Sequence, residues 1–179
     1  MSYGAQLGVE DIVAVLARGG SRPLGPGQRV TQLEHALQTG ALLRQERPDD
    51  IELAVAGLVH DIGQLLPGAR DETHGVDGAD AVRAALGERV AGIVELHVEA
   101  KRYLVATESN YMARLAGDSV VSLGRQGGAL TAEEAAAFLA QPWAADAVAL
   151  RRVDDRGKVE SLGGDGLDPW LPLLRHVSE

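Results

Sequence analysis

The dipeptide His60-Asp61 constrains the fold of this chain more than any other feature. It follows an unbroken apolar run over residues 53–59, so an imidazole and a carboxylate close a helix that should be buried. Burying two such groups is unfavourable unless they are hydrogen-bonded or satisfied by a cation. The dipeptide therefore predicts a metal site near the centre of the protein.

Candidate ligands for that metal occur on separate segments, each among mostly small or aliphatic neighbours. The ordered set is His35, His60, Asp61, His74, His97 and Asp154. The chain has no cysteine, so the ligands must be nitrogen and oxygen atoms, and a mixture of imidazole and carboxylate suits iron, manganese, zinc or cobalt. A lone histidine is more often a hydrogen-bonded core residue, and an aspartate beside a turn is usually a helix cap. We prefer the metal site because the whole set is present, and we assign His176 no such role.

The number of ligands predicts two metal ions. Four residues can supply one ion: His35, His60, Asp61 and Asp154. His74 and His97 can hold a second ion if Asp61 bridges both through its two oxygens.

A group of basic and polar residues follows His97 in the sequence. Lys101 lies one helical turn beyond this histidine, on the same face, so its ammonium can project toward the metals. Lysine, hydroxyl groups and an arginine fork are suited to a phosphate or phosphonate; the candidates are Lys101, Ser119, Ser122, Gln126 and Arg151. The alternative is a solvated helix face on which Lys101 and Arg102 pair with Glu95 or Glu99. We prefer that alternative for Arg102 only.

The periodicity of apolar residues predicts an all-α helical bundle. No segment shows the sustained alternation of β-branched and aromatic residues that a sheet needs. We expect helices over residues 10–17, 31–44, 50–60, 78–86, 88–104, 111–123, 142–152 and 170–177, with another beginning at Thr131. A loop should end at His74, and a turn should occupy residues 163–166. With 179 residues, the chain should form a single domain over positions 1–179.

Composition limits the partners and the location. The net charge of −9 argues against a general nucleic-acid or anionic-membrane surface. The sequence shows no signal peptide and no apolar run near the roughly 18 residues of a membrane span. We therefore expect a cytoplasmic protein that binds a small molecule and neither nucleic acid nor membrane. Its oligomeric state is left open.

With these motifs in place, the sequence resembles the HD-domain superfamily and, within it, the mixed-valent di-iron oxygenases of organophosphonate catabolism. The resemblance covers about residues 32–158. Its stretches are residues 32–38, 58–63, His74 with 78–80, 97–105, 126–128, and Asp154 with 157–158. The stretch from His97 to Val105 is the most specific, because many HD-type phosphohydrolases share the metal ligands alone.

The resemblance implies a function and a role for each residue. One iron would be held by His35, His60, Asp61 and Asp154, and the other by Asp61, His74 and His97. The phosphonate pocket would be lined by Lys101, Ser119, Ser122, Gln126 and Arg151, with Asp61 and Lys101 as the catalytic residues. The implied reaction uses O2 and an Fe(II)/Fe(III) pair to cleave the C–P bond of a 1-hydroxyalkylphosphonate. The products are a carboxylic acid and inorganic phosphate.

Departures from the family pattern occur at one end of the site. The family member that oxidises 2-amino-1-hydroxyethylphosphonate has a tyrosine and a glutamate where this chain has Gly25 and Gln28, and a histidine where it has Gln64. We assign Gln28 and Gln64 to the substrate pocket and infer that it lacks the acid that pairs with a primary ammonium. We therefore expect the aminoethyl compound to be a poor substrate. A quaternary ammonium or uncharged substituent should be preferred.

Two other functions are compatible with the residues. The first alternative is a metal-dependent phosphohydrolase acting on a nucleotide or phosphate ester. The second is a metal-stabilised binding module without turnover. The segment Lys101-Arg102-Tyr103 favours the oxygenase.

Overall fold

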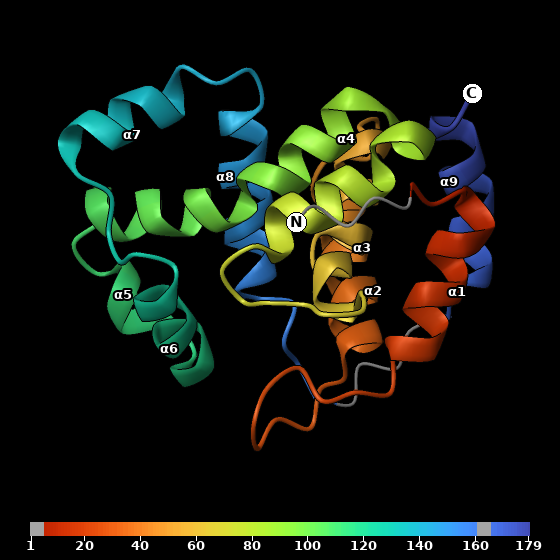
Figure 1. The fold of residues 1–179 in the computed structure, drawn as a ribbon, viewed down its shortest axis with the longest axis horizontal. Helices are drawn as coiled ribbons and strands as arrows, with labels where there is room; N and C mark the ends of the chain where they lie inside the picture. Colours follow the sequence, from red (N-terminus) through yellow and green to blue (C-terminus); the bar gives the residue numbers. More distant parts are fainter. Residues whose placement is uncertain (1–5, 161–165) are drawn as a thin grey trace.

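The computed structural model describes residues 6–160 and 166–179, and within these ranges the elements are α-helices and 3-10 helices, without a β-strand (Figure 1). The prediction of an all-α fold is therefore confirmed. The elements are α1 (Val9–Gly19), α2 (Gln32–Glu46), α3 (Ile51–Val59), η1 (Ile62–Leu65), α4 (His74–Thr107), α5 (Tyr111–Arg114), α6 (Gly117–Arg125), α7 (Ala132–Leu139), α8 (Ala144–Asp154), η2 (Asp168–Trp170) and α9 (Leu171–Val177). In the described part of the chain, no helix is both long enough and apolar enough to cross a bilayer.

Side-chain caps fix where the two helices before the metal site begin. The Thr31 hydroxyl accepts a hydrogen bond from the backbone N–H of Glu34 at 3.2 Å, and the Glu34 carboxylate accepts one from the Thr31 N–H at 2.8 Å. The Asp50 carboxylate accepts a bond from the N–H of Leu53 at 3.1 Å. Such caps supply partners that the first turn of a helix lacks. They therefore fix the register of His35 on α2 and of His60 at the end of α3.

Two glycines let α2 and α3 pack closely beneath His60. A Cβ atom on Gly57 would lie 2.5 Å from a Leu43 methyl group and 3.3 Å from the Cα of Gly40. Neither position has room for a larger side chain without movement of the neighbouring helix. The two glycines therefore allow the close approach of these helices.

The apolar core surrounds α3, whose residues 53–59 are all buried. The largest cluster joins α3 to α1, α2, the first part of α4, α8 and α9. Two smaller clusters hold the peripheral helices: one packs α7 against α4 and α8, and the other packs α5 and α6 against the end of α4. In Figure 1, α5 and α6 lie together at the end of the long α4 segment. This packing holds α6 beside the second half of α4.

The largest differences from the predicted helix boundaries occur at α4 and between α5 and α6. Helix α4 begins at His74, four residues before the predicted start, and continues to Thr107 with a non-helical Gly87 (φ 78°, ψ 173°). The break predicted at Gly87 is thus confirmed. The single helix predicted over 111–123 is wrong, because Leu115 and Ala116 have extended backbones that separate α5 from α6. The predicted turn at 163–166 lies outside the described residues except for Gly166.

Candidate metal centre and substrate pocket

Four buried histidines donate one ring N–H to a backbone carbonyl. The Nδ1 atoms of His35, His60, His74 and His97 lie 2.7, 2.8, 2.7 and 2.6 Å from the carbonyl oxygens of Gly157, Gly57, Asp71 and Val94. A carbonyl oxygen only accepts, so each Nδ1 must carry the proton. Each neutral ring therefore presents an unprotonated Nε2 atom.

These Nε2 atoms face one another in two pairs. The distance between them is 3.2 Å for His35 and His60 and 3.0 Å for His74 and His97. Two acceptor lone pairs at this separation repel each other unless a proton or a metal ion lies nearby. Histidine ligands of metals commonly donate their second N–H to a carbonyl in this way, so the donor set fits a metal ion at each pair.

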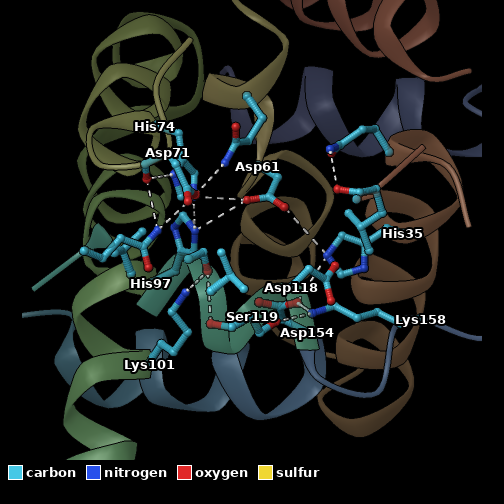
Figure 2. Close-up of a pocket in the computed structure, with 18 of the residues that line it drawn as sticks. His35, Asp61, Asp71, His74, His97, Lys101, Asp118, Ser119, Asp154 and Lys158 are labelled. Carbon is cyan, nitrogen blue, oxygen red and sulfur yellow. Dashed lines mark hydrogen bonds and ion pairs between the residues drawn. The ribbon is translucent and has the colours of Figure 1, made fainter. Parts of the chain in front are cut away.

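Asp61 lies between His35 on one side and His74 and His97 on the other (Figure 2). Its Oδ2 atom is 3.8 Å from Nε2 of His35 and 3.6 Å from Nε2 of His60. Its Oδ1 atom is 3.3 Å from Nε2 of His74 and 3.6 Å from Nε2 of His97. One carboxylate thus offers a different oxygen to each pair, which is the geometry that a bridging ligand needs.

Asp154 adds a further carboxylate to the first pair. It ends α8, and its Oδ1 atom is 3.2 Å from Nε2 of His35. Its Oδ2 atom is 3.9 Å from Nε2 of His60. The structure therefore brings together all six predicted metal ligands, in one group of four and one of three that share Asp61.

Burial and the central carboxylate control the protonation of these groups. Burial lowers the pKa of His35 to about 4 and lowers those of His60 and His97, so all three are neutral near pH 7. Burial would raise the pKa of Asp61, but the surrounding imidazoles hold it well below its usual range. Burial opposes protonation of His74 too, but its contact with Asp61 raises the pKa of this histidine. An ionised carboxylate among largely neutral imidazoles is a competent metal-binding set.

Gly63 brings the two halves of the site together. A Cβ atom at this position would collide with the backbone carbonyl of His74. The close approach of η1 to the first turn of α4 therefore requires glycine. It holds Asp61, which precedes η1, near His74.

A pocket of about 810 Å³ opens beside the histidines, large enough for a small organic molecule. Lys101 lines it and is only 5% exposed, and its ammonium donates to the Ser122 hydroxyl at 2.7 Å. Lys158 also lines it and donates to the Ser119 hydroxyl at 3.3 Å. The pocket thus presents two lysines, each beside a hydroxyl group, close to the histidines.

Arg151 reaches the pocket with its guanidinium already engaged. It forms ion pairs with Asp154 and Asp155, and its Nε donates to the Tyr111 hydroxyl at 3.2 Å. Arg151 therefore connects the pocket to a candidate metal ligand, in contrast to the free fork predicted from sequence.

Arg102 lies outside the pocket lining, as preferred from the sequence, but the predicted partner is wrong: it pairs with Glu134 at 3.8 Å and not with Glu95 or Glu99. Its Nε donates to the carbonyl of Gly128 at 2.9 Å, because the chain folds back after α6 and brings Gly128 beside the helix. The arginine ties this loop to α4.

The three glutamines assigned to the pocket contact carboxylates. Gln64 and Gln126 line the pocket and approach Oδ1 of Asp71 at 3.5 and 3.4 Å. Gln28 lies outside the pocket lining and donates to both carboxylate oxygens of Asp118 at 3.2 Å. The expectation that this end lacks an acid is therefore wrong, because Asp118 lines it.

Sequence reasoning missed five charged residues of the pocket lining: Arg22, Asp71, Asp118, Arg125 and Lys158. Lys158 could have been found, since it follows Asp154 by four residues, the spacing of Lys101 from His97, although it lies beyond the end of α8. Asp118 gave no local signal, because its contact with Gln28 spans 90 positions.

Comparison with known proteins agrees with this site. The HD domain family matches residues 32–140. A 1-hydroxy-2-(trimethylamino)ethylphosphonate dioxygenase (glycine-betaine-forming) from Leisingera caerulea is 36% identical over 84% of this chain and 81% of its own length. A hydroxymethylphosphonate dioxygenase from Gimesia maris is 38% identical over 75% of this chain and 71% of its own. An uncharacterized protein of Acanthamoeba polyphaga mimivirus is 30% identical over 90% of this chain and 77% of its own length.

Proposed function

We propose that this chain, which belongs to the HD-domain family, is a di-iron oxygenase that cleaves the C–P bond of a 1-hydroxyalkylphosphonate. One observation carries the proposal: the Asp61 carboxylate lies between two histidine pairs whose Nε2 atoms face each other at 3.2 and 3.0 Å. The neighbouring pocket adds two lysines for an oxyanion. Both relatives with an assigned activity are phosphonate dioxygenases.

In this proposal the metal ligands are His35, His60, Asp61 and Asp154 for one iron and Asp61, His74 and His97 for the other. Oxygen and nitrogen donors without thiolate suit iron. When bound, an Fe(II)/Fe(III) pair would supply the site at which O2 is reduced, and the substrate itself would supply the four electrons. The products are a carboxylic acid and inorganic phosphate.

The protein's own residues bind and orient the substrate. Lys101 and Lys158 neutralise the phosphonate, while Ser119 and Ser122 hold the two ammonium groups in position. Arg151 keeps the Asp154 carboxylate directed toward His35, because it pairs with that carboxylate and is itself held by Tyr111 and Asp155. Gln64 and Gln126 fix Asp71, whose backbone carbonyl accepts the N–H of His74.

The charge and the absence of a bilayer-crossing helix in the described residues support a small-molecule enzyme. We retain a cytoplasmic location as part of the proposal. Nucleic acid and membrane are not expected partners.

Phosphate release from a panel of 1-hydroxyphosphonates tests the proposal. We expect turnover under air and none without O2, together with an EPR signal from coupled Fe(II) and Fe(III) in the aerobically purified protein. A phosphohydrolase would release phosphate from phosphate esters without O2. Turnover of such esters under anaerobic conditions, with no turnover of 1-hydroxyphosphonates under air, would overturn the oxygenase assignment.

A further inference from the structure

We propose that Asp118 is a specificity-determining residue that accepts a positively charged nitrogen on the substrate. The inference rests on the proposed function and specifies its substrate class: 1-hydroxyphosphonates with a cationic substituent. Four observations support it: the position of Asp118, the lack of an ion pair to it among the described residues, the kinds of side chain around it, and its nearness to the residues that would bind the phosphonate.

Asp118 is held at the pocket wall by the loop that precedes α2. A Cβ atom on Gly25 would lie 2.7 Å from Oδ2 of Asp118, so the glycine leaves room for the carboxylate. The Gln28 amide donates to both carboxylate oxygens at 3.2 Å. The acid is thus held from outside the pocket by a neutral donor and not by a cation.

The other carboxylates of the pocket already have cationic or metal-binding partners. Asp61 and Asp154 belong to the histidine cluster, and Asp71 forms an ion pair with Arg125 at 3.4 Å. In the described residues, Asp118 takes part in no ion pair. Lys158, the cation that faces it, is held by Asp154 at 3.4 Å and by Ser119.

A cation at this end would find acceptors but no aromatic wall. Gln32 also lines the pocket, and its buried Oε1 atom has no hydrogen-bond partner within the described ranges. None of the described residues that line the pocket is phenylalanine, tyrosine or tryptophan. Cation–π contacts are therefore unavailable, and a carboxylate is the group that can stabilise a positive charge here.

Asp118 also lies beside the phosphonate end of the pocket. It precedes Ser119, the hydroxyl that accepts a hydrogen bond from Lys158, and consecutive Cα atoms are only about 3.8 Å apart. A phosphonate bound by the two lysines therefore leaves a substituent on C2 within reach of Asp118. A molecule with a phosphonate at one end and a positively charged nitrogen at the other therefore matches the two lysines and Asp118.

Two isosteres test the charge alone. They are 1-hydroxy-2-(trimethylammonio)ethylphosphonate and 1-hydroxy-3,3-dimethylbutylphosphonate, in which carbon replaces the quaternary nitrogen. The primary amine 2-amino-1-hydroxyethylphosphonate forms a third arm. We expect Asp118→Asn to lower kcat/KM for both cations by about tenfold to 100-fold, through KM, and to change that of the neutral isostere by less than about threefold.

The control variants separate charge from structure. Asp118→Glu should retain part of the preference for cations, and Gly25→Ala should reduce it by displacing the carboxylate. Glu133→Gln removes one exposed charge outside the pocket and should leave the preference unchanged. An equal loss for the neutral isostere in Asp118→Asn, or a wild-type enzyme without preference for cations, would overturn the proposal.

Anaerobic calorimetry on the metal-loaded protein provides a readout independent of turnover. The cationic isostere should bind at least tenfold more tightly than the neutral one to the wild type, and about equally to Asp118→Asn. If the wild type bound the cationic and the neutral isostere with equal affinity, the role of Asp118 would be refuted. If binding follows this pattern but no phosphate is released under air, the oxygenase assignment fails and the specificity assignment stands.

Discussion

Replacing Lys101 with methionine tests how the pocket binds the phosphonate, because it removes one charge and keeps the apolar stem. Lys101 is 5% exposed, so its ammonium and a bound phosphonate would form a buried pair. Losing one partner of such a pair costs about 2–5 kcal/mol. Lys158 remains in the pocket, but it is partly neutralised by Asp154 at 3.4 Å. We therefore expect the variant to lose about 2–3 kcal/mol of phosphonate binding, which corresponds to a fall in kcat/KM of roughly 30-fold to 150-fold.

The pH dependence gives the same prediction a second measurement. Burial, followed by repulsion from Arg151, lowers the pKa of Lys101 to about 8. The charged form binds the phosphonate, so kcat/KM should fall as the pH rises through about 8. This limb should be reduced in Lys101→Met, where only Lys158, whose pKa burial also lowers, remains to bind the phosphonate. The metal content should not change, because the Lys101 ammonium donates its hydrogen bond to Ser122 and not to a candidate metal ligand.

A matched variant removes an equal charge elsewhere. Arg44 is exposed on α2 and does not line the pocket, so Arg44→Met should keep the wild-type kcat/KM and pH profile. An unchanged kcat/KM in Lys101→Met would refute the binding role. Loss of metal from that variant would show that Lys101 supports the metal site.

Three further perturbations address the metal centre. Asp61→Ala should lose metal from both positions, measured by elemental analysis, whereas His176→Ala should retain it; full occupancy without Asp61 would rule out a bridge. Gly63→Ala should destabilise the fold by about 1–3 kcal/mol, measured by denaturant unfolding, because the new methyl group collides with the carbonyl of His74. Metal at 100 times its dissociation constant should stabilise the protein by about 2.7 kcal/mol. For a chain of this size, removal by a chelator should then lower Tm by about 5–11 °C in a calorimetric scan, and an unchanged Tm would contradict a metal-linked fold.

Local chemistry explains why the metal centre could be predicted from the sequence. The His60-Asp61 pair follows an apolar helix, and caps at Thr31 and Asp50 fix the helices that carry His35 and His60. Glycine at position 63 is part of the same local pattern. These features act over a few residues, so reading the sequence is sufficient to find them.

The boundaries around α4 and α6 depended on packing that the sequence does not reveal. His74 begins α4 because the neighbouring η1 packs against its first turn at Gly63, and helix propensity alone does not specify this contact. The break at Leu115 and Ala116 allows α6 to fold back beside α4. Leu115 and Leu123 then pack in the same small cluster at the end of α4.

The substrate end of the site required the three-dimensional structure because its charges are balanced across long separations in the chain. Asp118 and Gln28 are 90 positions apart, and their contact replaces the acid that seemed to be missing from the loop before α2. A pocket can therefore contain a carboxylate from a distant part of the chain when the residue at the usual sequence position is not acidic. For this reason, the substitutions at Gly25 and Gln28 do not by themselves exclude a cationic substrate. Since Gly25 makes room for Asp118 and Gln28 donates to it, the same two residues favour such a substrate.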